Sequence, residues 1–178
     1  VSEVFCAPGN PGTAEVATNL PISVSDIPGL VNAAREHRID LVMVGPEKPL
    51  DLGLADALRM AGIPVCGHSA DATAIESSKA FAKALMAEAH IPTARSVIVS
   101  DIQTGETVLQ NFSLPVVIKA DGLAEGKGVV IARSHEEAVA TLRAFLVDAS
   151  VGAAGDSVLI EEYLTGLEVS AIALVDGE

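Results

Sequence analysis

The sequence is poor in aromatic side chains. It contains no Trp, one Tyr and four Phe among 178 residues, although 49% of its residues are hydrophobic. Its apolar content therefore comes from Ala, Val, Leu and Ile, which suits an α/β protein with strands packed between helices and argues against a β-sandwich. A chain of this length and hydrophobicity can bury one large core or two small ones, which argues against a disordered protein.

Basic residues are also scarce. The sequence has 11 Lys and Arg residues against 24 Asp and Glu residues, which gives a formal net charge of -13 at pH 7. We expect no nucleic-acid partner, because binding to a phosphate backbone needs a surplus of Lys and Arg on one face. Small anionic ligands stay compatible with this charge, because a few local amides and lysines can hold them.

Long hydrophobic runs and cysteines are few. No apolar run reaches the ~18 uncharged residues of a membrane-spanning helix, and the first residues do not resemble a signal peptide. Cys6 and Cys66 lie in or beside apolar strand-like runs, which predicts buried, reduced thiols. We therefore expect a soluble cytoplasmic protein without a membrane partner.

The first part of the chain alternates between strand-like and helix-like segments, which predicts βαβ units on a parallel sheet. Asp26 followed by Pro28 is a plausible helix start. The residues before about 72 are expected to form this Rossmann-like, parallel-sheet domain. The predicted strands cover residues 4–7, 41–44 and 63–67, and the strand over residues 41–44 is expected to be buried. The predicted helices cover residues 27–38 and 52–61.

Two loops of this domain follow predicted strands. Asn10, Gly12 and Thr13 lie in one, and Pro46 and Glu47 lie in the other. Ligands of open parallel sheets bind at the carboxyl ends of the strands, so the two loops could face one cleft. Plain turns are the alternative.

The pattern changes at a boundary near residues 70–75, and residues 73–178 are expected to form an α+β unit with hairpins. Short β-rich runs follow one another there, separated by turns and one helix. The predicted helices cover residues 78–89 and 135–147, and the predicted strands cover residues 96–99, 116–119, 129–132 and 158–161.

The strongest local signal is the segment from Val116 to Val129. A buried strand ends at Lys119, and a turn with three glycines and Lys127 precedes the next strand. Glycines let backbone amides approach phosphate oxygens, and lysines supply the opposite charge, so the segment predicts a phosphate-binding lid. A Walker loop does not fit, because a strand follows the Gly-Lys-Gly run. A glycine-rich hairpin with solvated lysines is the alternative.

Weaker signals come from Lys79, from the strand end at Glu161–Leu164 and from Glu168. A strand end can present a carbonyl and an amide to an adenine edge while a carboxylate binds ribose hydroxyls. Taken singly, Lys79 is better explained as a surface lysine, and the acidic residues are better explained as solvated residues at a strand end. His68 and His90 lack partners at metal-ligand spacing, so no metal site is predicted within this chain. No residue is predicted with certainty to be catalytic.

Five segments follow one another along the chain, and their order is part of the resemblance: Ala7–Thr13, Val44–Leu50, Glu76–Phe81, Lys119–Val129 and Ile160–Leu164. Together they resemble the glycinamide ribonucleotide synthetase family (phosphoribosylamine-glycine ligases) of the ATP-grasp superfamily, and the resemblance extends over essentially the whole chain. It implies an incomplete N-terminal pre-ATP-grasp domain in residues 1–72, and an incomplete ATP-grasp domain with its lid in residues 73–178.

The resemblance also implies an activity. Family members join glycine to 5-phosphoribosylamine through a glycyl phosphate, with cleavage of ATP to ADP and phosphate, in purine biosynthesis. They use Mg²⁺ or Mn²⁺, and in some organisms they are fused to other purine-pathway domains. The resemblance places the metal ligands beyond Glu178, and an opening strand and glycine-rich loop before Val1, so we expect the isolated chain to lack ligase activity.

The resemblance assigns site residues in two groups. The residues implied to line the phosphoribosylamine side are Asn10, Gly12, Thr13, Pro46 and Glu47. The residues implied to bind ATP are Lys79, Lys119, Gly122, Leu123, Gly126, Lys127, Gly128, Glu161, Glu162, Tyr163, Leu164 and Glu168.

The sequence departs from the family pattern at Gly67-His68, where Gly-Pro is usual, at Glu125, where Ala is usual, and at Leu167, where Glu is usual. The alternatives are another ATP-grasp carboxylate-amine ligase or carboxylase, such as one acting on biotin, and a non-catalytic nucleotide-binding relative. A degenerate relative would be compatible with the departures at Glu125 and Leu167.

Overall fold

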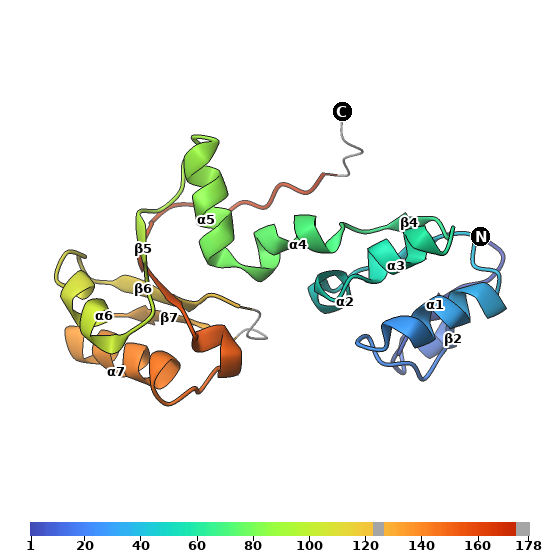
Figure 1. Ribbon diagram of the computed structural model, residues 1–178, viewed down its shortest axis with the longest axis horizontal. Coiled ribbons are helices and arrows are strands. Elements are labelled where there is room, and N and C mark those ends of the chain that lie inside the picture. Colours follow the sequence, from blue (N-terminus) through green and yellow to red (C-terminus); the bar gives the residue numbers. More distant parts are fainter. Residues whose placement is uncertain (123–126, 174–178) are drawn as a thin grey trace. The chain divides into compact units, whose positions relative to one another are not determined.

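The computed structural model describes residues 1–122 and 127–173, and the chain divides into two compact units (Figure 1). Unit 1 comprises residues 1–91 together with 121–128, and unit 2 comprises residues 92–120 together with 129–178. Within the described residues, no helix is long and apolar enough to cross a membrane.

Unit 1 is a set of short strands and helices around a small apolar core. Helix α1 packs on α3, and Leu54, Leu58 and Ile63 are among the buried residues between them. Its elements are β1 (Phe5–Cys6), the 3₁₀ helix η1 (Thr13–Glu15), β2 (Thr18–Asn19), α1 (Ile27–Glu36), β3 (Val42–Met43), α2 (Glu47–Asp51), α3 (Leu54–Met60), β4 (Val65–Cys66), α4 (Ala70–Ser77) and α5 (Lys79–Glu88).

The start of α1 is the one that the sequence predicts. The Asp26 carboxylate accepts a hydrogen bond from the Gly29 N–H at 3.0 Å, and Pro28 occupies the first turn. An N-cap acid satisfies an amide that has no partner inside the helix, and proline in the first turn removes no helical hydrogen bond. Both local signals therefore act in the folded protein as expected.

The strands of unit 1 pair in parallel, which confirms the α/β class, but they form two sheets instead of one. β1 pairs with β2, and β3 pairs with β4. The expected burial of residues 41–44 is wrong, since Leu41 is 54% exposed and Met43 is 68% exposed. The reason is that β3 is paired on one side by β4, while residues 41–44 also line a cavity.

Cys6 and Cys66 lie in these small sheets and are therefore half-buried free thiols, less buried than expected.

The helix expected over residues 52–61 begins at Leu54, as α3, and a second helix that was not expected, α2, precedes it. Gly53 has a left-handed φ of +82° and separates α2 from α3. Glycine adopts this conformation without a side-chain clash, so the chain reverses there instead of continuing one helix. Helix α2 begins at Glu47, inside the segment that was expected to be a loop.

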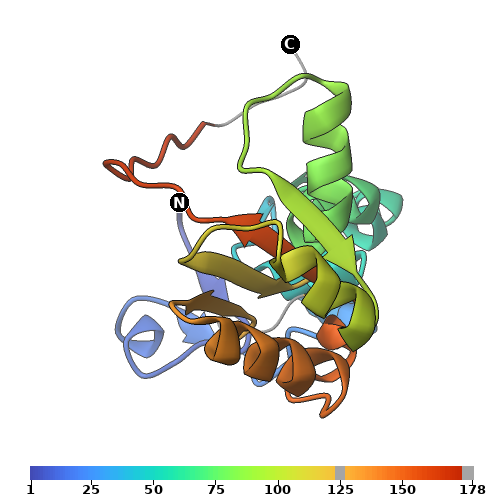
Figure 2. The ribbon, with the colours of Figure 1, turned by 90° about the vertical axis from the view of Figure 1, so that its left-hand side faces the viewer.

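Unit 2 is a four-stranded antiparallel sheet in the order β5-β8-β6-β7. Helices α6 and α7 lie on one of its faces (Figure 2). The four strands and α7 lie where the sequence predicts them, whereas α6 was not predicted. Its elements are β5 (Ser96–Val99), α6 (Ile102–Leu109), β6 (Val116–Ala120), β7 (Val129–Ala132), α7 (His135–Leu146), the 3₁₀ helix η2 (Gly152–Gly155) and β8 (Val158–Glu162).

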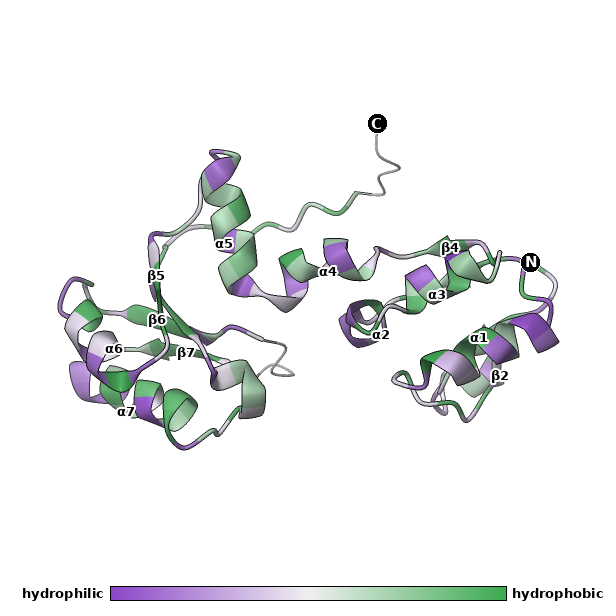
Figure 3. Cartoon of the chain, viewed as in Figure 1, coloured by the Kyte–Doolittle hydropathy of each residue, from purple (hydrophilic) through white to green (hydrophobic). Residues whose placement is uncertain are grey.

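The core of unit 2 lies between this sheet and its two helices. Ile118, Leu142, Val158 and Ile160 have no solvent exposure, and Figure 3 shows hydrophobic residues gathered along β6 and β7. Successive side chains of a strand point to opposite faces, so Ile118 faces the helices and Lys119 faces away from them. The alternation therefore places Lys119 on the sheet face that points away from α6 and α7.

Replacing Leu142 by Ala is expected to destabilise unit 2 by about 3 kcal/mol, because it removes fully buried methyl groups and leaves a cavity. Urea unfolding followed by circular dichroism measures this change. Arg143→Ala, an exposed site on the same helix, is the control and should change the unfolding free energy by less than about 0.5 kcal/mol. Equal effects of the two substitutions would contradict the position of the core.

The Asp101 carboxylate caps α6. It accepts hydrogen bonds from the Thr104 N–H at 2.8 Å and from the Thr104 hydroxyl at 2.7 Å. The backbone bond, followed by the hydroxyl bond, lowers the pKa of Asp101 below its ordinary value of 3.8. A lowered folded-state pKa contributes stability that is present above the ordinary pKa and is lost as the pH falls through the folded pKa.

We therefore expect the stability difference between the wild type and Asp101→Ala to shrink as the pH falls from about 6 to about 2.5. Urea unfolding of both proteins across this range measures it. Comparing the two proteins at each pH removes the contribution of the other carboxylates. A difference that stays constant over the whole range would show that the charge of Asp101 does not support the helix.

Candidate nucleotide and substrate site

An ion pair lies on the sheet face of unit 2 that points away from α6 and α7. The Lys119 ammonium on β6 contacts the Glu161 carboxylate on β8. Lys119 lies opposite Leu159 in the register, so the two charged residues are diagonal neighbours on adjacent strands. The Glu161 side chain is 5% exposed and that of Lys119 is 30% exposed. A carboxylate this deeply buried requires a nearby cation or hydrogen-bond donors, and Lys119 supplies a cation.

The surface around this pair is apolar. Val117 and Leu159 are buried beside it, while Ile98, Val129 and Ile131 are 45%, 49% and 42% exposed. All five lie on the same sheet face as the pair, by the strand register. Apolar side chains beside a cation are suited to an aromatic ligand that carries anionic groups.

The end of β8 limits which residues of Glu161–Leu164 have backbone N–H and C=O groups outside the sheet pairing. The Glu162 N–H donates to the Arg95 carbonyl at 3.0 Å, and the Glu162 carboxylate accepts from the Arg95 N–H at 2.8 Å. Sheet pairing ends at Glu162, and the exposed residues Tyr163 and Leu164 follow. The backbone of β8 pairs with β5 and β6, so within Glu161–Leu164 only Tyr163 and Leu164 lie beyond the sheet pairing.

In unit 1, the start of the glycine-rich segment contacts the start of α5. The Lys79 ammonium donates to the Gly122 carbonyl at 3.1 Å, which brings together two predicted site residues that are distant in sequence. The Asp121 carboxylate accepts from the Ala80 N–H at 2.7 Å. Sequence reasoning did not select Asp121, and no local pattern pairs it with α5.

The other predicted residues of this region are exposed, or lie outside the described residues. Lys127 is exposed and Gly128 is buried. Leu123, Glu125 and Gly126 lie outside the described residues. Beyond β8, Glu168 is exposed, and Leu167, where the family usually has Glu, is 91% exposed.

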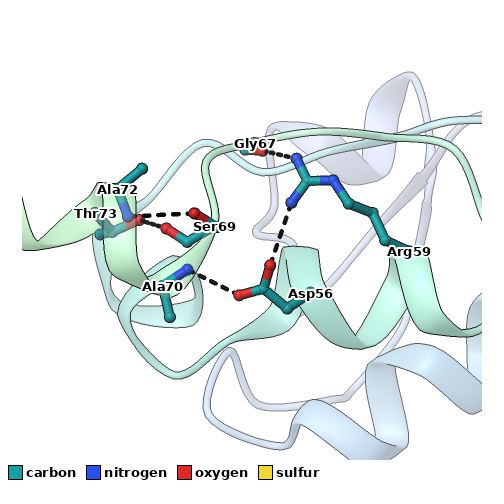
Figure 4. A network of polar contacts seen from close by, with 7 residues as sticks. All are labelled: Asp56, Arg59, Gly67, Ser69, Ala70, Ala72 and Thr73. Carbon is teal, nitrogen blue, oxygen red and sulfur yellow. Dashed lines mark hydrogen bonds and ion pairs between the residues drawn. The ribbon is translucent and has the colours of Figure 1, made fainter.

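A polar network fixes the start of α4, the helix that leads into α5 (Figure 4). The Asp56 carboxylate accepts from the Ala70 N–H at 2.8 Å, and the Arg59 guanidinium donates to the Gly67 carbonyl at 2.5 Å. Both side chains come from α3, and they also pair with each other at 3.4 Å. They hold residues 67–70, which include the departure from the family pattern at the exposed His68.

The loop with Asn10, Gly12 and Thr13 is closed by its own side chains. The Asn10 N–H donates to the Thr13 hydroxyl at 2.8 Å, and the Thr13 N–H donates to the Asn10 amide oxygen at 3.0 Å. Asn19 on β2 donates to the Asn10 carbonyl at 2.8 Å. A Cβ on Gly9, whose φ is +75°, would come within 2.2 Å of the Asn19 side chain. Asn19 was missed because the short, polar β2 gave no strand signal.

The second predicted loop lies beside a cavity of about 650 Å³ in unit 1. Gly45 and Pro46 line this cavity, as do residues of β1, α1 and β3, whereas the described lining contains neither Glu47 nor the Asn10–Thr13 loop. Glu47 is exposed in the first turn of α2. The walls of the cavity are mainly apolar.

Among residues 1–122 and 127–173, no group of three or more His, Cys, Asp or Glu side chains is placed to hold a metal ion. The described residues thus offer cations and apolar surface for a nucleotide, but no complete set of metal ligands.

Two family profiles match the chain end to end. The one described as phosphoribosylglycinamide synthetase, N domain, matches residues 1–76, and the one described as phosphoribosylglycinamide synthetase, ATP-grasp (A) domain, matches residues 77–178. The chain belongs to the phosphoribosylglycinamide synthetase family. The resemblance inferred from five sequence segments is therefore confirmed.

Individual members of the phosphoribosylglycinamide synthetase family agree. The chain is 45% identical over 180 residues to phosphoribosylamine–glycine ligase of Escherichia coli O6:H1, covering 100% of this chain and 42% of that protein. The crystal structure of phosphoribosylamine–glycine ligase from Thermotoga maritima matches with a TM-score of 0.75 at 30% identity, over 93% of this chain and 39% of that one. The chain thus spans less than half the length of these relatives.

The fold is also shared outside the family. The biotin carboxylase domain of 2-oxoglutarate carboxylase from Hydrogenobacter thermophilus, in complex with MgADP, ADP and bicarbonate, matches with a TM-score of 0.68 at 22% identity. It covers 85% of this chain and 36% of that one. At this identity the likeness concerns the fold alone, and the ATP-grasp assignment rests on the family profile that matches residues 77–178.

Lys119→Ala is expected to destabilise unit 2 by about 2 kcal/mol, because it removes a cation from beside the buried Glu161 carboxylate. The estimate is lower than for a fully buried pair, because Lys119 is partly exposed. Urea unfolding measures the loss, and Lys119→Arg should restore most of it. As a control, Arg133→Ala, an exposed site just after β7, should have little effect. If Lys119→Ala leaves the free energy of unfolding unchanged, the ion pair does not stabilise unit 2.

Proposed function

We propose that this chain is part of an ATP-dependent ligase that joins glycine to 5-phosphoribosylamine, giving glycinamide ribonucleotide in purine biosynthesis. The proposal is supported by membership of the phosphoribosylglycinamide synthetase family and by 45% identity to a phosphoribosylamine–glycine ligase. The observation that carries the nucleotide part is the Lys119–Glu161 pair on an apolar sheet face. The glycine carboxylate takes the γ-phosphoryl group of ATP and releases ADP, and the amine of phosphoribosylamine then attacks the resulting glycyl phosphate and displaces phosphate.

ATP is the ligand that fits this sheet face. The apolar side chains offer a wall for adenine, Tyr163 and Leu164 offer backbone groups for its edge, and Glu168 offers a carboxylate for the ribose. Lys119 and Lys79 would each bind phosphate oxygens, and Gly122, Gly126, Lys127 and Gly128 would cover the phosphates, together with Leu123. The related carboxylase domain with bound MgADP supports nucleotide binding by this architecture.

The phosphoribosylamine side is proposed to involve Asn10, Gly12, Thr13, Pro46 and Glu47. The closed Asn10–Thr13 turn is held by Asn19, so its exposed backbone groups are fixed before a ligand arrives. Such a reaction depends on positioning and on neutralisation of charge more than on a protein nucleophile. Rigid turns at the substrate side fit that requirement.

A divalent metal, Mg²⁺ or Mn²⁺, would neutralise the triphosphate, and we propose that its carboxylate ligands follow Glu178 in the complete ligase. The complete protein is proposed to be a cytoplasmic enzyme with small-molecule substrates and no nucleic-acid partner, consistent with the net charge of -13 of these 178 residues. Another ATP-grasp ligase or carboxylase is less well supported, because the carboxylase match is only 22% identical.

The test is ATP-dependent formation of glycinamide ribonucleotide by the full-length protein, supplied with glycine and freshly generated phosphoribosylamine. Lys119→Ala is expected to lower product formation by about 100-fold or more, because it removes a cation from the phosphates. The folded fraction of Lys119→Ala and of Lys119→Arg is measured in parallel. A loss of product caused by unfolding is thereby distinguished from a loss caused by weaker phosphate binding. ATP binding without product from any amine acceptor would favour a non-catalytic relative.

A further inference from the structure

Two consecutive residues of the glycine-rich segment hold three consecutive residues at the start of α5. The Asp121 carboxylate accepts from the Ala80 N–H at 2.7 Å and from the Ser78 hydroxyl at 3.3 Å. The Gly122 carbonyl accepts from the Lys79 ammonium at 3.1 Å. The Ser78 hydroxyl in turn accepts from the Phe81 N–H at 3.1 Å. All of these residues belong to unit 1.

Lys79 occupies an electrostatically unfavourable place. It is the first residue of α5, where the helix presents unpaired N–H groups and a partial positive charge. The first turn of α5 contains no acidic residue that would offset this charge. Asp121 supplies the missing negative charge from a distant part of the sequence, so a lysine at this position is tolerated.

We infer that Asp121 is a positioning residue for Lys79. Its carboxylate, together with Ser78, fixes the backbone from which the Lys79 side chain extends, and it directs the ammonium to a defined position. This inference rests on the proposed function, in which Lys79 binds ATP phosphates. A residue that supports a binding group in this way limits the positions that the group can adopt and so lowers the cost of binding.

A merely structural role would act differently. If Asp121 only held the glycine-rich segment to α5, its loss would weaken ATP binding by the same factor with and without the Lys79 side chain, because the segment itself is proposed to cover the phosphates. If it positions Lys79, its loss would weaken ligands with phosphates and spare adenosine. Its effect would also disappear once Lys79 itself is gone, because the two substitutions would remove the same interaction.

The experiment measures binding of ATP and of adenosine to the full-length protein by calorimetry, in the wild type, D121A, K79A and the double variant. We expect D121A to weaken ATP binding about fivefold, as for the loss of a helix cap, and to leave adenosine binding unchanged. K79A should weaken ATP binding at least as much. In the K79A background, D121A should add no further loss for ATP.

The matched control is D101A, which removes the same kind of carboxylate cap from α6 in unit 2. It should leave the ratio of ATP to adenosine affinity at the wild-type value. D121N keeps an acceptor for the Ala80 N–H and removes only the charge, so it should give a smaller loss of the same kind. It also carries the test if D121A does not fold, as judged by circular dichroism.

The outcomes separate the two proposals. A wild-type protein that does not bind ATP would overturn the proposed function. ATP binding that K79A weakens, but that D121A and D121N leave unchanged, would overturn only the positioning role. Equal loss of ATP and adenosine in D121A, or the same additional loss in the K79A background, would assign Asp121 to structure alone and would overturn it as well.

Discussion

The buried carboxylate of Glu161 constrains much of unit 2. A charge held at 5% exposure on a central strand requires compensation, and the antiparallel register of β6 and β8 brings the Lys119 ammonium to it. The same register turns Ile118 and Ile160 toward α6 and α7, so one pairing arrangement builds both the core and the charged site. A shift by one residue would exchange the two faces and bury the lysine among apolar side chains.

Unit 1 depends on polar side chains that satisfy the backbone of a different segment. Asp56 binds the start of α4, Asp121 binds the start of α5, and Asn19 binds the turn at Asn10. The unit has short strands and a small core, so apolar burial alone fixes its loops weakly. Directional hydrogen bonds supply the missing precision, and they do so next to the residues proposed to bind substrate and ATP.

Much of unit 2 could be predicted, because its signals are local. The apolar runs at β5, β6, β7 and β8 gave the strands at nearly their observed bounds, and the helix predicted over residues 135–147 is observed as α7. Helix α6 was missed, because Thr and Gly within Ile102–Leu109 weaken its helical signal and the Asp101 cap was overlooked. The same locality made Lys79, Lys119 and the glycine-rich segment recognisable as candidates.

The sequence by itself determined the family and the α/β class, and it selected Lys79, Lys119 and Lys127 as candidate ATP-binding lysines. Each of these depends on short segments whose residues are neighbours in the chain. Only the tertiary structure decided that Glu161 holds Lys119, that Asp121 caps α5 and that the parallel strands divide into two sheets. The physical reason is that pairing between distant segments depends on register and burial. A strand or an acidic residue does not carry its partner's position in its own neighbourhood.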